Sequence, residues 1–432
     1  MFKKIKNTIL KVDKFLYKKF GSDRSTKVLE NIKEAQLIFS NLNKHAGERK
    51  VQFVGGCVRR AINGEDIDDI DLATSLEPEE VKELLTKQNI KVIDTGILHG
   101  TVTAIINKKK FEITTLRKDI FTDGRHANIE YTTSWKEDSE RRDFTINAIY
   151  SDIEGRIYDP LNGISDLKSG TIRFIGNAEK RIREDYLRIL RYFRFFVHYS
   201  KNDFDQEIII AIKKNINGIN KISNERILDE LRKIFKLKNF DILFFNSISK
   251  KVLLNIFPQF LYYNRLNVIK KLKENLKYKF DSNLILALLV VDQSDGYEYF
   301  CHKYKVSNNI RKRFKNISKN YESLKNSKFY LEENLKKLIY FLGKEYVVDL
   351  LLFSVLININ KKQINIEYLV DYVTKTEIPK FPISGDFLKK YGYETGVELG
   401  KKINNLKEQW IENNFIIDDE VIKKNLGNLK EN

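Results

Sequence analysis

The sequence predicts an α+β protein, in which a small α/β head is followed by an elongated, all-helical remainder. Two observations lead to this prediction. Eleven of the 20 glycines fall within the first 175 residues, where short β-branched and aromatic runs alternate with turn residues. From about Gly176 onward, apolar residues instead recur three and four positions apart, which is the period of a helix.

The same patterns predict individual elements. Arg226–Phe235 and Leu331–Leu342 have the apolar spacing of amphipathic helices. Pro258 interrupts one helical stretch, and Pro379 and Pro382 mark a break before the C-terminal segment. Three runs in the head are predicted strands: VQFVGG, GTVTAII and KFEITTLR.

The composition points to a polyanionic partner. The 432 residues suffice for two to four domains, and 42% hydrophobic residues suffice for their cores. Lys and Arg outnumber Asp and Glu by 77 to 59, so nucleic acid is the first partner to consider. A general bias toward Lys, Ile and Asn is the alternative explanation. Cys57 and Cys301 are too few and too far apart for a disulfide framework or a zinc site, which fits a reducing compartment.

The sequence contains no run of 18 or more apolar residues, and its most apolar stretch, Leu284–Val291, has the length of a core element. No membrane partner is therefore expected. Residues 1–20 are basic and roughly amphipathic. We interpret them as a helix packed on the body, rather than a membrane contact or a presequence, because they are rich in Lys and lack Arg and Ser. The expected compartment is the cytoplasm, with the mitochondrial matrix as the alternative.

The stretch Gly64–Leu72, GEDIDDIDL, concentrates five acidic residues in this basic chain. If residues 67–72 form a strand, Asp69 and Asp71 point to the same face and could share divalent cations. Asp66 and Asp68 have the same spacing, but they closely follow Gly64 and are expected on the turn before the strand. Two aspartates at this spacing also arise by chance in so charged a chain.

A glycine pair precedes the acidic stretch. Gly55 and Gly56 predict a turn whose bare backbone N–H groups can approach phosphate oxygens, and Arg59 supplies a guanidinium that binds them bidentately. Arg59 stands ten residues before Asp69. This order is expected of a site that holds a nucleoside triphosphate beside two metal ions.

Together with later motifs, these residues resemble a known family. The chain is similar to the class II tRNA nucleotidyltransferases, the CCA-adding enzymes of the polymerase β superfamily, which also includes bacterial poly(A) polymerases. The resemblance covers about residues 50–235, and FPISGDFL and the region of Trp410 resemble the C-terminal part of the family. One residue departs from the pattern, because the family usually has Asp where this chain has Arg60. The motifs, in order, are VGGCVRR, DIDLAT, RRDFTINA, DPLNGISDL and EDYLRILRYFRF.

The resemblance implies a polymerase β-like nucleotidyltransferase head followed by a helical neck, body and tail. We expect the neck to recognise the nucleotide base, and the body and tail to bind tRNA. The expected domains are an N-terminal helical extension (1–46), the catalytic head (47–175), the neck (176–245), the body (246–375) and the tail (376–432).

The resemblance also implies the chemistry: an RNA 3′-hydroxyl attacks the α-phosphate of a nucleoside triphosphate, with two Mg²⁺ ions held by Asp69 and Asp71. Glu112, in the strand-like FEITTLR, is the candidate for a third metal ligand, and an exposed strand residue is the alternative interpretation. His99 and His126 lack metal-ligand spacing and are assigned to structure or loop contacts.

The motif EDYLRILRYFRF is predicted to form one helix, with Asp185, Arg188 and Arg191 along a stripe that Arg194 continues. By resemblance, this stripe is a protein template for the incoming base. A carboxylate only accepts hydrogen bonds and a guanidinium only donates them, so Asp185 and Arg188 would fit C and A and reject U and G. The alternative is an ordinary salt-bridged helix face, with the first glutamate of the motif paired to Arg188.

Other motifs receive supporting roles. Arg142 can reach the bound nucleotide, and Asp143 could accept from a ribose 2′-hydroxyl or cap the predicted helix FTINAIY. Arg117–Glu140 resembles the family's flexible loop, which indicates addition of A as well as C. DPLNGISDL is expected to be a hinge, and Ser223–Lys233 a neck-stabilising helix with a capping serine.

The expected substrates are CTP, ATP and the acceptor arm and 3′ end of tRNA, and no obligatory protein partner is evident. Lys303–Lys328, with nine Lys or Arg residues and one Glu, is expected to contact tRNA phosphates. One alternative is a bacterial poly(A) polymerase, although the chain lacks a long basic C-terminal tail. The other is a catalytically silent RNA-binding relative, against which the intact pair of Asp69 and Asp71 argues.

Overall fold

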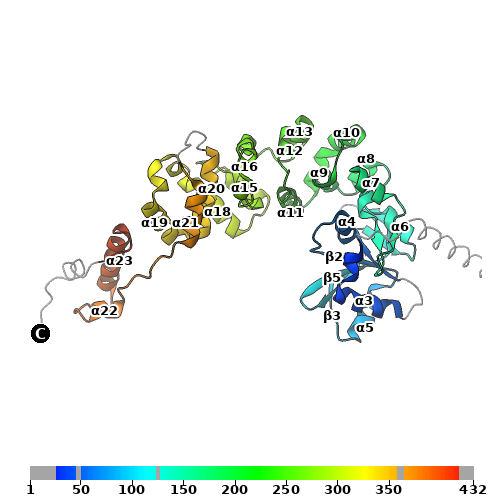
Figure 1. Ribbon diagram of the computed structural model, residues 1–432, viewed down its shortest axis with the longest axis horizontal. Coiled ribbons are helices and arrows are strands. Elements are labelled where there is room, and N and C mark those ends of the chain that lie inside the picture. The colour runs from blue at the N-terminus through cyan, green and yellow to red at the C-terminus, as the bar shows by residue number, and fades with distance from the viewer. Residues whose placement is uncertain (1–25, 45–49, 123–126, 358–363, 418–432) are drawn as a thin grey trace, which may run out of the picture. The chain divides into compact units, whose positions relative to one another are not determined.

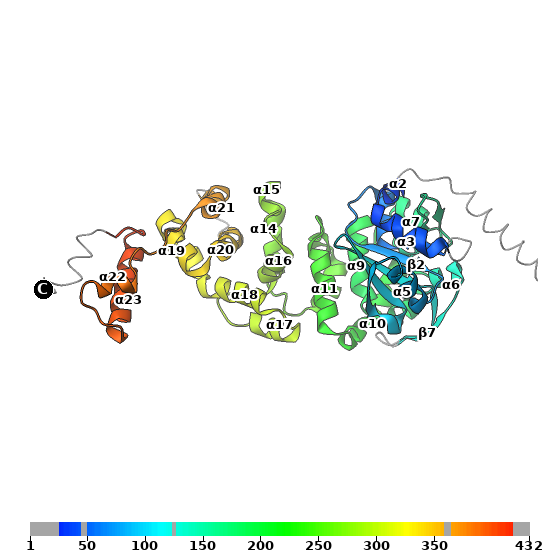
Figure 2. The same cartoon turned by 90° about the horizontal axis from the view of Figure 1, so that it is seen from below.

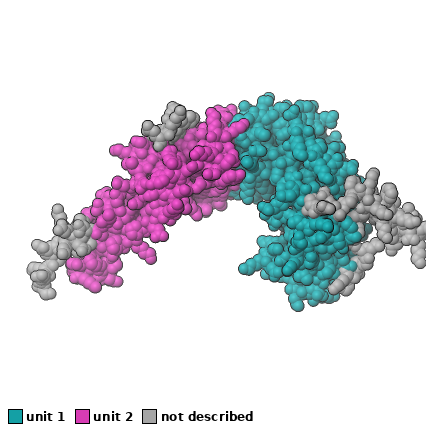
Figure 3. All heavy atoms as spheres, in the orientation of Figure 1, with its two compact units in different colours: residues 1–252 teal, residues 253–432 magenta. Residues whose placement is uncertain are grey.

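The computed structural model describes residues 26–44, 50–122, 127–357 and 364–417. The chain divides into two compact units, residues 1–252 and 253–432, which Figure 3 shows in two colours. The predicted α+β class is confirmed, because all described strands lie in the first unit and the second consists of helices and turns (Figure 1). The predicted helix over residues 1–20 lies outside the described residues. Within the described ranges, no helix is long and apolar enough to span a membrane.

The first unit contains a seven-stranded mixed sheet in the order β3-β4-β5-β2-β1-β8-β9. Only β2 and β5 pair in parallel, and the remaining neighbours are antiparallel. The strands are β1 (Val51–Val54), β2 (Ile70–Thr74), β3 (Lys91–Gly96), β4 (Thr101–Ile106), β5 (Lys109–Thr115), β8 (Tyr150–Ser151) and β9 (Ile157–Tyr158). The three runs predicted as strands are therefore confirmed as β1, β4 and β5.

A core forms between this sheet and the helices α3, α4 and α5, which pack against it. Figure 2 shows α3 and α5 beside β2. Its side chains include Phe39, Phe53, Leu72 and Phe111, all almost fully buried. The helices of this region are α2 (Lys27–Glu30), α3 (Lys33–Lys44), α4 (Gly56–Asn63), α5 (Pro78–Thr86), the 3₁₀ turn η2 (Ile97–His99) and α6 (Trp135–Glu140).

An aromatic cluster connects helix α9 to earlier segments of the first unit. Phe144, from the motif RRDFTINA, contacts the rings of Phe174 and Phe195, with centroids 4.5 and 5.2 Å away. Tyr192 stacks on Phe174, so α9 is fixed to the segment that carries this motif. The elements are η3 (Thr145–Asn147), α7 (Gly163–Ser169), α8 (Ala178–Glu184), α9 (Arg188–Tyr199), α10 (Gln206–Asn215), η4 (Ile216–Lys221), α11 (Asn224–Phe235), α12 (Ile242–Phe245) and α13 (Ser247–Ile256).

In the second unit, α16 is buried on all sides, as expected for the most apolar stretch of the sequence. Pro258 follows the end of α13, and Pro379 and Pro382 fall between helices, as predicted. Trp410 packs against Phe381 and other rings near the C-terminus. The elements are η5 (Tyr263–Arg265), α14 (Leu266–Lys270), α15 (Glu274–Lys277), α16 (Ser282–Val290), α17 (Tyr297–Lys303), α18 (Asn308–Asn320), η6 (Ser323–Lys325), η7 (Ser327–Tyr330), α19 (Glu332–Leu342), α20 (Lys344–Ile357), α21 (Ile366–Lys375), α22 (Gly385–Lys389) and α23 (Val397–Glu412).

Two local predictions were wrong, and the segment that was compared with a flexible loop contains regular structure in its described residues. The segment FTINAIY forms only the 3₁₀ turn η3, because Ala148 leaves the helical region and the chain continues into β8. Ser223 precedes α11, but its hydroxyl makes no capping hydrogen bond. The polar segment 117–140 contains regular structure: β6 (Arg117–Thr122) and β7 (Ala127–Tyr131) pair as a two-stranded sheet, and α6 follows.

Candidate active site

The predicted metal-binding carboxylates come from two parallel neighbouring strands. The register pairs Asp71 of β2 with Glu112 of β5, so both side chains leave the sheet on one face. Asp69 is exposed and lies one residue before β2, whose pairing starts at Ile70 rather than at residue 67 as predicted. The acidic residues before Ile70 form an exposed connection instead of a strand.

The electrostatics at Asp71 favour a cation. Burial and the negative charges of Glu112 and Asp69 raise the pKa of Asp71 to about 6, although the positive charges of Arg142 and Arg59 act to lower it. A partly desolvated carboxylate beside two others is an environment that a divalent cation stabilises. In the described part of the chain, no three His, Cys, Asp or Glu side chains already stand in a metal-binding arrangement.

The glycine turn lies between Asp71 and Arg142. Gly55 has φ +70°, in the left-handed region that favours glycine, and its carbonyl starts α4 by accepting from the Arg59 N–H. A Cβ on Gly55 would lie 3.7 Å from Nη1 of Arg142, and one on Gly56 would lie 4.0 Å from Oδ2 of Asp71. The bare backbone therefore leaves room between a carboxylate and a guanidinium, as a phosphate chain requires.

Arg59 lies deeper than the sequence suggested. Its guanidinium donates to the amide oxygen of Asn147 and lies over the rings of Phe195 and Tyr199, 4.9 and 5.1 Å from their centroids. The Nε of Arg59 is buried and has no hydrogen-bond partner among the described residues. A buried N–H group without a partner is unfavourable, so a phosphate oxygen reaching it would be stabilised.

Two acidic residues of the stretch Gly64–Leu72, Asp68 and Glu65, have partners elsewhere in the first unit. Arg60, which stands where the resembling family usually has Asp, pairs with Asp68 at 3.2 Å on an exposed part of the turn. Glu65 accepts hydrogen bonds from Tyr199 and pairs with His198, both at 3.2 Å. Glu65 and Asp68 therefore have structural partners, and of the remaining three acidic residues Asp69 and Asp71 are the predicted metal ligands.

Arg142 is held by a residue that the motifs did not indicate. Asp138, fully buried on α6, accepts from Arg142 at 2.9 Å, from Arg141 at 2.8 Å and from the hydroxyl of Tyr150 at 2.7 Å. Burial acts to raise the pKa of Asp138, but the charges of Arg142 and Arg141 lower it well below its usual range. Asp138 is thus ionised and orients the guanidinium of Arg142 beside Gly55.

Asp143, in the motif RRDFTINA, connects that motif to α9. Its carboxylate accepts from the side-chain amide of Asn147 and from the N–H of Phe144, and pairs with Arg191. Burial opposes ionisation, but Arg191 and the hydrogen bond from Asn147 hold the pKa of Asp143 well below its usual range. Asp143 is therefore an ionised acceptor.

The predicted continuous helix over Glu184–Phe195 is wrong. Helix α8 ends at Glu184, and Asp185 has extended backbone, with φ −152° and ψ 105°, before α9 begins at Arg188. Asp185 accepts the N–H of Leu187 two residues on, a local hydrogen bond that competes with the helix. Tyr186 packs on Gly218, where a Cβ would lie 2.0 Å from the ring, and this contact also fixes the break.

The three arginines of α9 still follow the predicted spacing, and each is paired with a carboxylate. Arg188 donates to Glu184 at 2.7 Å, the ion pair of the alternative interpretation. Arg191 pairs with Asp143, and Arg194 pairs with Glu230 of α11. The structure thus contains the salt-bridged face, and it places that face beside the glycine turn through the contacts of Arg59 with Phe195 and Tyr199.

Comparisons with known proteins agree with this arrangement. Residues 51–173 match a family described as the poly A polymerase head domain, and residues 203–263 match one described as the probable RNA and SrmB-binding site of polymerase A. The mouse mitochondrial CCA tRNA nucleotidyltransferase 1 is 33% identical, and the match covers 88% of this chain and 86% of the relative. The CCA-adding enzyme of Lactobacillus helveticus is 32% identical, with 87% and 92% covered. The chain belongs to the CCA-adding tRNA nucleotidyltransferase family.

Solved structures of CCA-adding enzymes share the fold. The Bacillus stearothermophilus enzyme in complex with CTP matches with a TM-score of 0.65 at 23% identity, covering 88% of this chain and 92% of that one. The Thermotoga maritima enzyme complexed with tRNA matches with a TM-score of 0.61 at 20% identity, covering 93% and 96%. The matches extend over both units of this CCA-adding enzyme family member.

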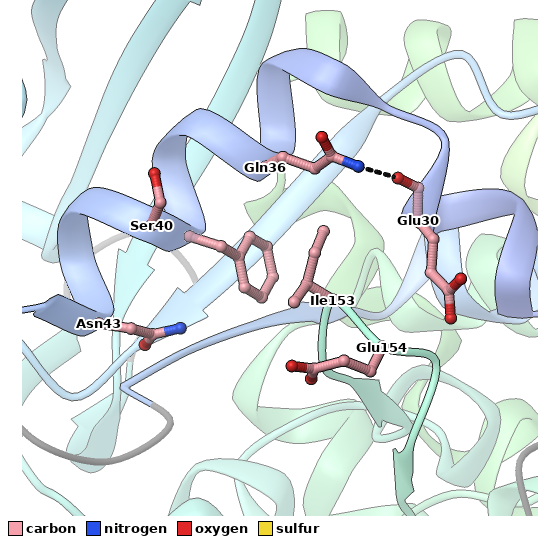
Figure 4. Close-up of a pocket in the computed structure, with 7 residues that line it drawn as sticks. Glu30, Gln36, Ser40, Asn43, Ile153 and Glu154 are labelled. Carbon is pink, nitrogen blue, oxygen red and sulfur yellow. Dashed lines mark hydrogen bonds between the residues drawn. The ribbon is translucent and has the colours of Figure 1, made fainter.

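Another pocket of the head is unsuited to a nucleotide. A hollow of about 650 Å³ beside α3 is lined by Phe39 and Ile153 and by the carboxylates of Glu30 and Glu154 (Figure 4). Among the described residues, its lining includes no Lys or Arg and none of the predicted site residues. A triphosphate there would face negative charge, so the glycine turn remains the candidate site.

The role of Asp138 can be tested with an isosteric change. Asp138→Asn keeps the shape but removes the charge that orients Arg142, so we expect KM for CTP and ATP to rise about tenfold, the effect of losing one charge-assisted hydrogen bond. Steady-state kinetics on tRNA lacking CCA measure this change. Glu140→Gln, on the exposed side of α6, is the control and is expected to leave KM unchanged. An unaltered KM in Asp138→Asn would exclude the orienting role.

Proposed function

We propose that this protein adds or repairs the CCA sequence at the 3′ end of tRNA, using CTP and ATP and releasing pyrophosphate. The observation that carries the proposal is the identity of about one third with named CCA-adding enzymes, over 84–90% of the chain. The site agrees with it: a glycine turn beside carboxylates, and a selecting segment that contains both a carboxylate and guanidinium groups.

Asp69 and Asp71 would hold two Mg²⁺ ions, with Glu112 as the candidate for a third ligand. Oxygen ligands suit Mg²⁺, and the charge gathered at Asp71 supports the assignment. Bound Mg²⁺ ions would activate the RNA 3′-hydroxyl and stabilise the leaving pyrophosphate.

The triphosphate would lie along the glycine turn. The backbone of Gly55 and Gly56 admits it closely. Positive donors on either side are Arg142 and the Nε of Arg59, which has no hydrogen-bond partner within the part of the chain that the structure describes. Asp143 accepts from the ribose 2′-hydroxyl, which favours ribonucleotides over deoxyribonucleotides. Its low pKa supports this role, because only the ionised carboxylate is purely an acceptor.

Base choice is proposed for Asp185 and Arg188, with Arg191 and Arg194 extending the same face. Cytosine and adenine present an amino donor beside a ring-nitrogen acceptor, which suits a carboxylate next to a guanidinium. Uracil and guanine present the inverse pattern and leave polar groups unpaired. No nucleic acid template is needed for this choice.

We further propose residues 47–175 as the catalytic head and 176–245 as the base-recognising neck. The segments 246–375 and 376–432 are the tRNA-binding body and tail. Residues 1–46 form an extension that precedes the head. The poly(A) polymerase alternative is not favoured, since the named relatives are CCA-adding enzymes. A silent RNA-binding relative would not need the paired Asp71 and Glu112.

The compartment is proposed to be the cytoplasm, because the chain is similar to bacterial CCA-adding enzymes over most of its length. The mitochondrial matrix is the alternative, since the vertebrate relatives are named as mitochondrial enzymes.

The activity is tested by incubating the purified protein with tRNA lacking its CCA end and with each labelled nucleotide in turn. CTP alone is expected to label the tRNA, ATP alone is not, and ATP is expected to label a tRNA that already ends in CC. Labelling by ATP alone on the shortened tRNA would contradict the proposal.

Binding of tRNA is expected to weaken steeply with salt. The basic stretch Lys303–Lys328 carries exposed cations on α18, including Lys312. The logarithm of the binding constant should fall with log salt at a slope of about −0.7 to −0.9 per phosphate neutralised. Equilibrium binding between low and moderate salt measures the slope. The double variant Lys312→Gln and Lys315→Gln should have a shallower slope. Binding by the unaltered protein that does not depend on salt would contradict a role for these charges.

A further inference from the structure

Helix α11 carries two charged side chains that pair with residues of the segment proposed to select the base. Arg226 and Glu230 lie one turn apart on α11, which packs against α9. Arg226 pairs with Asp185 at 2.7 Å, and Glu230, almost fully buried, pairs with Arg194 at 2.5 Å. One helix thus contacts both ends of the polar face that is proposed to choose the base.

The pair of Arg226 and Asp185 has an orienting geometry. Oδ2 of Asp185 accepts from Arg226, and Oδ1 accepts from the N–H of Leu187 at 3.2 Å. A carboxylate has about four acceptor positions, so each oxygen keeps one for an incoming amino group. With both oxygens held, the plane of the carboxylate is fixed before the base arrives.

The backbone at Asp185 is fixed as well. Tyr186 is seated on Gly218 and the side chain of Lys221 lies over its ring, so the break between α8 and α9 has a defined conformation. The backbone at Asp185 is therefore held by one contact and the carboxylate by another. Arg226 is the contact that acts on the carboxylate.

We propose that Arg226 is a specificity-determining positioning residue, which orients Asp185 toward the amino group of cytosine or adenine. This inference rests on the proposed function of Asp185. The pair is partly exposed, with side-chain exposures of 32% for Arg226 and 21% for Asp185. An ion pair with that exposure contributes little to the stability of the fold, so its main effect falls on base choice.

The test compares three variants of the full-length protein by kcat/KM for CTP and UTP on tRNA lacking CCA. Arg226→Ala is expected to lower the CTP-to-UTP ratio about tenfold, the effect of one lost charge-assisted hydrogen bond. Arg226→Lys, which keeps a cationic donor, should recover most of the ratio. Arg232→Ala is the control on the same helix, because Arg232 pairs with the exposed Asp229 instead, and it should leave the ratio unchanged.

A double variant separates positioning from support of the fold. If Arg226 acts through Asp185, adding Arg226→Ala to Asp185→Ala changes the ratio no further, since the group that it orients is gone. A ratio unchanged in Arg226→Ala, or a full additional loss in the double variant, would overturn the inference. If Arg226→Ala does not fold, Arg226→Gln serves in its place. Failure of the unaltered protein to add CTP would instead refute the proposed function itself.

Discussion

Replacing Asp71 with alanine is expected to lower kcat for nucleotide addition by about a thousandfold or more, because metal-ion stabilisation of the transition state is worth several kcal/mol. Asp69→Ala should have an effect of the same order. Asp71 lies on β2 and Asp69 one residue before it, and neither belongs to the apolar core, so the melting temperature and the affinity for tRNA should change little. Single-turnover kinetics and equilibrium tRNA binding measure the two quantities separately.

Asp68→Ala is the matched control in the same acidic stretch. Its carboxylate pairs with Arg60 on the surface, and an exposed pair of this kind is worth about 0–1 kcal/mol. Activity close to that of the unaltered protein is expected. Equal losses in Asp68→Ala and Asp71→Ala would mean that the wrong aspartates have been assigned to the metal ions.

Replacing Asp185 with alanine is expected to raise the UTP-to-CTP ratio of kcat/KM by about tenfold or more. CTP and ATP lose the acceptor for their amino group, at about 1–3 kcal/mol for an unpaired polar group. UTP gains, because its O4 no longer faces a negative charge. Kinetics with each nucleotide on tRNA lacking CCA measure the ratio.

Arg188→Ala supplies the complementary measurement. Cytosine and adenine both offer a ring nitrogen to this guanidinium, so use of CTP and ATP should weaken together. If the ratio stays constant in Asp185→Ala, the ion pairs of α9 are only structural. Selectivity would then come from the segment 117–140 or from the RNA end.

The sequence predicted most of the fold because local patterns determine most of it. Alternation of apolar residues identified β1, β4 and β5, and the 3.6-residue period identified α11 and α19. Gly56 lies close to Asp71, as the order of the glycine pair and the aspartates along the chain indicated. Near the active site, Asp71 and Glu112 meet because the register of two parallel strands aligns them. The local sequence around Asp71 or Glu112 does not predict this pairing register.

The remaining features depend on contacts between distant residues. The helix break at Asp185 relies on Tyr186 packing against Gly218, which is 32 positions further along the chain. Helical propensity alone cannot indicate such a contact. Asp138 is one of several acidic residues on its segment, and only its spacing of three and four residues from Arg141 and Arg142 could have singled it out. The pairing of Arg226 with Asp185 had no local signal.

The most direct test of the account supplies all four nucleoside triphosphates at equal concentration to the protein and a tRNA that lacks its CCA end. Sequencing of the extended 3′ ends then reports both the chosen bases and the length added. Because the protein itself is proposed to select the base, we predict ends that read CCA and stop, without incorporated U or G. Runs of A, mixed sequences, or unextended ends would contradict the central claim.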